Sequence, residues 1–173
     1  MTARHESVDA HRAAARQSLA IFVLTVSDSR SPADDRSGDR IVSLLSEAGH
    51  QLAGRAIVPD EASRIAASVN ETAKLESVDA IVVTGGTGVA PRDVTPEAVE
   101  PLFTTSLAGF GELFRSLSFA EIGAAAMLSR ATAGLIGDKP VFVLPGSTAA
   151  VKLAMEKLIL PEIGHLVSLA ARR

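Results

Sequence analysis

Apolar runs with the character of buried strands, each followed by a short polar or glycine-rich turn, most constrain how this chain can fold. They cover residues 19–26, 78–84 and 141–144. Continuous apolar sequence rich in Val and Ile is typical of strands covered on both faces, as in a parallel sheet. Between these runs, apolar residues recur at offsets of 0, 3, 4 and 7, which indicates amphipathic helices. This alternation predicts an α/β protein in which helical layers enclose a central sheet.

Weaker signals complete the expected order of elements. Thr95 followed by Pro96 predicts a helix start with Thr95 as the N-cap, and Pro161 is expected to interrupt the last helical stretch. Apolar residues at 110, 113, 114 and 117 form a stripe that we interpret as core or subunit contact. Further strands are expected at residues 51–58 and 130–136, and helices around residues 41–48, 62–69, 110–117, 151–158 and 163–170.

The length of 173 residues suits one well-buried core and is too short for two ordinary domains. No internal repeat or low-complexity linker divides the chain. Residues 1–17 contain no apolar block and resemble neither a signal peptide nor an anchor. We therefore expect a flexible N-terminal tail at residues 1–17 and a single domain over residues 18–173.

Composition removes several classes of function. The chain has no Cys, which excludes disulfides and thiolate chemistry and makes the cytoplasm the expected location. Its four His are scattered without ligand spacing, which argues against a zinc site. A net charge of -3 and an aromatic content of 3% argue against a nucleic-acid partner. No apolar run approaches the roughly 18 residues of a membrane span, so no membrane partner is expected.

Three strand-to-helix junctions share a small, polar character. They contain Ser27 and Asp28 after the first strand, Thr84, Gly85, Gly86, Thr87 and Gly88 after the third, and Pro145, Gly146 and Ser147 after the last. If the strands are parallel, all three junctions lie at one carboxyl edge of the sheet, where open α/β sheets bind ligands.

The glycine-rich junction carries the sharpest signal. Adjacent glycines permit positive φ and a close approach of the backbone to a ligand, while consecutive N–H groups can converge on an anion. The hydroxyls of Thr84 and Thr87 add donors. The alternative is that two glycines only make a tight turn. The spacing matches neither a GxGxxG fingerprint nor a Walker loop, so the residues alone name no ligand.

Three carboxylates accompany these junctions, and each has a structural alternative. Asp93 follows the glycine turn, where a carboxylate would repel a phosphate unless Mg²⁺ bridges them, or it caps the turn. Asp60 precedes a helix, so it is either an N-cap or a second metal or catalytic carboxylate. Asp28 either binds polar ligand edges or belongs to a turn.

Two further positions can hold negative charge. Ser147 is expected to cap the following helix, whose N-terminus can also bind an anion. Arg130, after Ser129, is either a surface charge or an anion clamp.

Taken in order, these segments resemble the molybdenum cofactor biosynthesis protein B family of MoaB/MogA type. The resemblance covers about residues 18–170. The matching segments are Thr25-Val-Ser-Asp-Ser-Arg30, Ser37-Gly-Asp39, Val58-Pro-Asp-Glu61, Thr84-Gly-Gly-Thr-Gly88, Arg92-Asp-Val-Thr-Pro-Glu-Ala98, Gly109-Phe-Gly-Glu-Leu-Phe-Arg115, Ser129-Arg-Ala-Thr-Ala-Gly134 and Pro145-Gly-Ser147.

The resemblance implies a three-layer α/β/α sandwich with a mixed, largely parallel sheet, the molybdopterin-binding fold, assembled as a trimer or hexamer. It implies an adenylyltransferase that uses Mg²⁺ to transfer AMP from ATP to molybdopterin, releasing pyrophosphate. Asp60 and Asp93 match the family's two essential acidic residues. Ser129, Arg130 and Pro145, Gly146 and Ser147 match the pocket rim.

Residues 109–123 resemble the MoaB branch, not all of whose members are active. Asp93 is retained here, which favours an active enzyme. The alternatives are a non-catalytic molybdopterin-binding or carrier protein, and a structural partner of other proteins of the same pathway.

Overall fold

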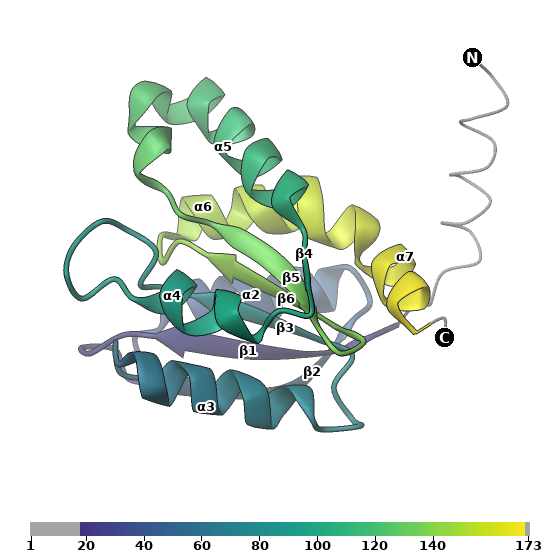
Figure 1. Cartoon of the computed structure of the whole chain (residues 1–173). Helices are drawn as coiled ribbons and strands as arrows, with labels where there is room; N and C mark the ends of the chain where they lie inside the picture. The colour runs from purple at the N-terminus through teal and green to yellow at the C-terminus, as the bar shows by residue number, and fades with distance from the viewer. Residues whose placement is uncertain (1–17, 172–173) are drawn as a thin grey trace, which may run out of the picture.

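The computed structural model describes residues 18–171, so the N-terminal tail expected at residues 1–17 lies outside the described residues. A single six-stranded sheet in the order β2-β1-β3-β6-β5-β4 forms the centre of the molecule (Figure 1). Its strands are β1 (Ala20–Val26), β2 (Gln51–Val58), β3 (Ala80–Thr84), β4 (Thr105–Ser106), β5 (Thr132–Ile136) and β6 (Lys139–Leu144).

Four neighbouring strands run parallel. β1 pairs in parallel with β2 and β3, and β3 pairs in parallel with β6, whereas β5 is antiparallel to both β6 and β4. The register places Thr25 beside Thr84, and Thr84 beside Leu144. The carboxyl ends of β1, β3 and β6 therefore lie side by side, as predicted from their shared junction chemistry. The mixed, largely parallel sheet is also confirmed.

Helices cover both faces of the sheet, which completes the expected three layers (Figure 1). One face carries α2 (Arg36–Glu47), α5 (Ala108–Ile122), α6 (Thr148–Ala154) and α7 (Leu160–Ala170). The other carries α3 (Ala62–Ala73) and α4 (Thr95–Val99). Short turns of 3₁₀ helix, η1 (Glu100–Leu102) and η2 (Gly123–Leu128), follow α4 and α5.

The central strands are buried on both faces because alternate side chains enter opposite cores. In β3, Ala80 and Val82 pack under α2 and α7, while Ile81 and Val83 pack under α3 and α4. All five residues of β3 are buried. This explains why the strand sequences lack polar alternation. Within residues 18–171, no helix combines the length and apolar character needed to cross a bilayer.

The expected N-cap at Thr95 is wrong. Helix α4 begins at Thr95 itself, the cap position belongs to Val94, and no side chain caps the helix. A tertiary contact with the glycine turn explains the difference. The N–H of Thr95 donates to the carbonyl of Gly86 at 3.0 Å, and the Thr95 side chain packs beneath that glycine instead of capping the helix. Pro96 occupies the first turn, as expected.

The expected interruption at Pro161 takes the form of a widened turn. A π-helical segment, η3 (Met155–Ile159), joins α6 to α7 without a break in the helical path. Pro161, which has no N–H to donate, falls in the first turn of α7. The wider turn allows the chain to pass the proline without ending the helix.

Candidate functional site

The turn after β3 has a backbone conformation that strongly favours glycine. Gly85 and Gly86 have φ values of +110° and +62°. A Cβ on Gly85 would lie under 3.0 Å from the carbonyl oxygen of Val26, and one on Gly86 under 3.0 Å from Oγ1 of Thr95. The glycines thus let this turn approach the end of β1 and the start of α4.

The same turn leaves a row of backbone donors without partners. The N–H of Gly85 donates to the carbonyl of Leu144 at 3.0 Å, which anchors the turn to β6. The carbonyl of Thr87 accepts from the N–H of Arg130 at 3.1 Å. Within residues 18–171, the N–H groups of Gly86, Thr87 and Gly88 donate to no acceptor. Consecutive free N–H groups of this kind can bind an anion.

A pocket of about 470 Å³ opens beside this turn and collects most of the predicted site residues. Asp60 and Asp93 both line it, together with the junction after β6. Thr84 lies behind the pocket and donates to the carbonyl of Pro145 at 3.1 Å, which ties the ends of β3 and β6 together. The full lining is Val26, Arg30, Asp60, Gly85, Gly86, Thr87, Gly88, Asp93, Leu128, Ser129, Pro145 and Gly146.

Ser27 and Ser147 shape the junctions instead of lining the pocket. Oγ of Ser27 accepts from the N–H groups of Ser29 and Arg30 and so forms its own turn. Ser147 is the N-cap of α6, as predicted, and its Oγ accepts from the N–H of Ala150 at 3.2 Å.

Asp60 is paired with Asp28 across two loops. Its Oδ2 accepts from the N–H of Asp28 at 3.0 Å, and Oδ1 of Asp28 accepts from the N–H of Asp60 at 3.1 Å. Arg92 donates to Oδ2 of Asp28. The N-cap alternative for Asp60 is wrong, because Glu61 holds that position in α3 without a side-chain cap.

The environment separates the pKa values of these two carboxyls. Burial, followed by repulsion from Asp28, raises the pKa of Asp60 above its ordinary value. The hydrogen bond from Arg92 lowers the pKa of Asp28. A carboxylate disfavoured by burial and negative neighbours gains most from a cation bound beside it.

Asp93 is held in the loop between β3 and α4. Its Oδ2 accepts from the N–H of Ala90 at 3.0 Å. Asp93 therefore does cap the turn, as the structural alternative predicted, but it uses only one of its two carboxylate oxygens to do so. A Cβ on Gly88 would lie 2.8 Å from the same oxygen, which shows how closely the carboxylate approaches the glycine turn.

Arg130 supports this loop from behind. Its Nε donates to the carbonyl of Gly88 at 2.8 Å, one terminal nitrogen donates to the carbonyl of Asp93 at 2.5 Å, and the other pairs with Glu97. The guanidinium thus fixes both ends of the loop that carries Asp93. Its direct contact with a ligand stays a prediction.

A buried charge network that sequence reasoning missed fixes the first junction. Asp35, fully buried, accepts from Oγ1 of Thr25 at 2.5 Å, from the N–H of Gly38 at 3.0 Å and from Arg55 at 2.8 Å. This joins the end of β1 to the start of α2 and to β2. The only sequence signal was an Asp before a helical pattern.

No protein-only metal cage is formed by residues 18–171, since no group of three or more His, Asp or Glu side chains is arranged to hold an ion. Mg²⁺ commonly binds through one or two carboxylates plus substrate phosphates. Asp60 and Asp93, which line one pocket beside free N–H groups, fit that type of site.

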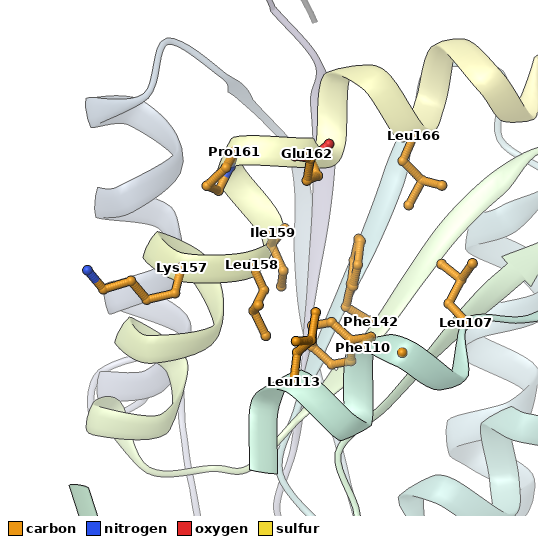
Figure 2. Close-up of a pocket in the computed structure, with 11 residues that line it drawn as sticks. Leu107, Phe110, Leu113, Phe142, Lys157, Leu158, Ile159, Pro161, Glu162 and Leu166 are labelled. Atoms are coloured by element: carbon orange, nitrogen blue, oxygen red, sulfur yellow. The ribbon is translucent and has the colours of Figure 1, made fainter. Parts of the chain in front are cut away.

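A second cavity of about 470 Å³ has a different character (Figure 2). It lies between α5, β6 and the start of α7, and Phe110, Leu113 and Phe142 converge at its centre. Its lining is almost entirely apolar, with Lys157 and Glu162 as the charged members. This apolar lining contrasts with the backbone N–H groups and carboxylates of the glycine-turn pocket.

Comparison with known proteins agrees with this geometry. Residues 22–165 match the family model described as "Probable molybdopterin binding domain". The chain belongs to this family. It is 51% identical over 162 residues to the molybdenum cofactor biosynthesis protein B of Bacillus subtilis, covering 93% of this chain and 95% of the relative.

Solved structures of the family have the same fold. A crystal structure of a molybdenum cofactor biosynthesis protein B superposes with a TM-score of 0.88 at 46% identity, over 91% of this chain and 99% of the other. The tungsten cofactor synthesizing protein MoaB of Pyrococcus furiosus has a TM-score of 0.81 at 38% identity, over 91% and 100%. The predicted family and fold are thereby confirmed.

Proposed function

We propose that this protein acts in molybdenum cofactor biosynthesis by transferring AMP from ATP to the terminal phosphate of molybdopterin, with release of pyrophosphate. One observation carries the proposal. The free N–H groups of Gly86, Thr87 and Gly88 share a pocket with two carboxylates, Asp60 and Asp93. Anion donors beside carboxylates suit a phosphate ligand that is bound together with a divalent cation.

The chain's residues would contribute by positioning and by charge, the main sources of catalysis in phosphoryl-type transfer. The N–H groups of the glycine turn would bind a phosphate group. Asp60 and Asp93 would hold Mg²⁺, which when bound neutralises charge on the ATP phosphates. An oxygen of the molybdopterin phosphate forms the new bond to the α-phosphorus, and the bond to the β-phosphate oxygen breaks. No side-chain nucleophile is required.

The direct test incubates the purified chain with molybdopterin, ATP and Mg²⁺ and measures adenylylated product and pyrophosphate. Formation of both supports the transferase. Binding of molybdopterin without pyrophosphate release would instead identify a carrier, and failure to bind either ligand would point to a structural partner of the pathway.

Asp93→Asn is expected to lower AMP transfer by at least roughly 100-fold while molybdopterin binding is kept. Even residues that only support a metal ligand cost up to about that much when removed. The amide oxygen of Asn can still accept from the N–H of Ala90, so the loop stays folded. Asp138→Asn, in the β5–β6 turn at the opposite edge of the sheet, is the control. Unchanged turnover in Asp93→Asn contradicts the metal-binding role.

We also propose that the protein is a homo-oligomer, a trimer or hexamer. Large apolar side chains are more than half exposed on α5 and η2, namely Leu113, Phe119, Ile122, Met127 and Leu128. An apolar surface of this kind typically marks a protein interface.

A further inference from the structure

The hydroxyl of Thr95 is buried without a hydrogen-bond partner. Thr95 is 0% exposed, and within residues 18–171 its Oγ1 is one of two buried side-chain polar atoms that lack a partner. The other, Nε of Arg55, belongs to a guanidinium whose remaining nitrogens bind Asp35 and Asp39. Thr95 has no such compensation.

Thr95 lies beneath Gly86, one of the residues that line the glycine-turn pocket. Its backbone N–H donates to the carbonyl of Gly86 at 3.0 Å, and its Oγ1 lies directly against Gly86. Oδ1 of Asp60 lies 2.9 Å from the place where a Cβ on Gly86 would be, which is also within 3.0 Å of Oγ1 of Thr95. The hydroxyl and the carboxylate therefore approach the same point, the space left open by the missing side chain of Gly86.

An unpaired buried hydroxyl costs free energy, and such groups in folded proteins call for an explanation. In the described conformation, Oδ2 of Asp60 accepts from Asp28, while Oδ1 accepts no hydrogen bond from residues 18–171. A donor without an acceptor thus faces an acceptor oxygen without a donor. Both oxygens lie beside the same glycine, Gly86.

We propose that Thr95 is a positioning residue, whose hydroxyl donates to Oδ1 of Asp60 when that carboxylate turns from Asp28 toward a cation-bound phosphate ligand in the pocket. The inference rests on the proposed function. Thr95 is suited to this role because its place in α4 and its complete burial hold the donor in one position. The second oxygen of Asp60 would then be available to hold the cation.

The test compares Thr95→Val, which removes the hydroxyl and nearly keeps the shape, with Thr95→Ser, which keeps the hydroxyl and removes the methyl group. Thermal unfolding of the free protein and calorimetric binding of Mg²⁺-ATP are measured for both. Thr95→Val is expected to keep or raise the Tm, since it removes an unpaired polar group, and to weaken Mg²⁺-ATP binding by roughly tenfold. Thr95→Ser is expected to lower the Tm and to bind like the wild type.

Thr25→Val is the matched control. Its hydroxyl is equally buried but donates to Asp35, so its removal is expected to lower the Tm and to leave Mg²⁺-ATP binding intact. Thr95→Val should thus keep or raise the Tm and weaken binding, whereas Thr25→Val should lower the Tm and leave binding unchanged. This contrast distinguishes a hydroxyl that serves the ligand from one that supports the fold.

Two results overturn the inference while the proposed function stands: wild-type affinity in Thr95→Val, or weakened binding in Thr95→Ser as well, which would assign the effect to packing. A wild type that does not bind Mg²⁺-ATP overturns the proposed function, and the role of Thr95 with it.

Discussion

Asp35 shows how one buried charge can organise a loop that carries ligand-binding residues. It accepts hydrogen bonds from Thr25, Ser37, the N–H of Gly38 and Arg55, although it has no exposed surface. The loop that follows β1 carries Ser27, Asp28 and Arg30. Loss of the Asp35 carboxylate would therefore lower the stability of the protein.

Asp35→Asn is expected to destabilise the protein by about 3–5 kcal/mol, because it removes a fully buried charge that pairs with the partly buried guanidinium of Arg55. Urea unfolding measures the change. Asp39→Asn is the control, since Asp39 also pairs with Arg55 but its side chain is 60% exposed. We expect a loss of under about 1 kcal/mol there. Equal effects in the two variants would refute this account.

The same carboxylate predicts a pH dependence. Burial alone would raise the pKa of Asp35, but hydrogen bonds from Thr25, Arg55, Gly38 and Ser37 outweigh it, and the pKa in the folded protein is lowered. The unfolded chain takes up the proton first, near pH 3.9. The stabilisation is thus complete above that pH and is lost as the pH falls through the lower folded pKa.

Urea unfolding between pH 6 and pH 2 measures this effect. The wild type should lose more stability below about pH 4 than Asp35→Asn does, because the variant has no carboxyl at this position to protonate. Parallel curves for the two proteins would show that Asp35 does not control acid unfolding.

The pocket depends on the turn after β3. Gly85 in this turn has both a positive φ and a close backbone neighbour, so a side chain is strongly disfavoured there. Gly85→Ala is expected to destabilise the protein by about 1–3 kcal/mol through its positive φ alone, and further through the contact with the Val26 backbone. That backbone belongs to a central strand and cannot move aside. Chemical denaturation measures the loss.

Gly109→Ala is the matched control for that prediction. It lies in α5, and an added Cβ would meet nothing within 4 Å. Alanine there should be neutral or stabilise by roughly 0.5–1 kcal/mol. A loss of stability similar to that of Gly85→Ala would mean that the two sites do not differ as the structure indicates.

For the molecule as a whole, the exposed apolar side chains of α5 and η2 predict assembly. Phe119, 63% exposed, is expected to be buried between subunits. Phe119→Glu should convert a trimer or hexamer into smaller species in light scattering coupled to size exclusion. Leu75→Glu is the control, because Leu75 is exposed at the end of α3, away from this surface. A wild type that is monomeric contradicts the proposed assembly.

Local sequence by itself determined the alternation of strands and helices, the glycine turn and the capping role of Ser147, since each follows from the period or chemistry of neighbouring residues. It also placed the three junctions at one edge, because strands that are buried on both faces and joined through helices run parallel. The order of the matching segments along the chain predicted the family and the fold, and the comparisons confirmed both.

Only the tertiary structure decided which partner each polar group finds. It directed Thr95 beneath Gly86 instead of into a cap, paired Asp60 with Asp28, and turned Arg130 toward the loop of Asp93. It also added β4 at the sheet edge and the widened turn before Pro161. These features depend on contacts between residues that are distant in the chain, and the local sequence pattern does not predict such contacts. The glycine turn was visible in the sequence, but the groups that surround it were brought there by the fold.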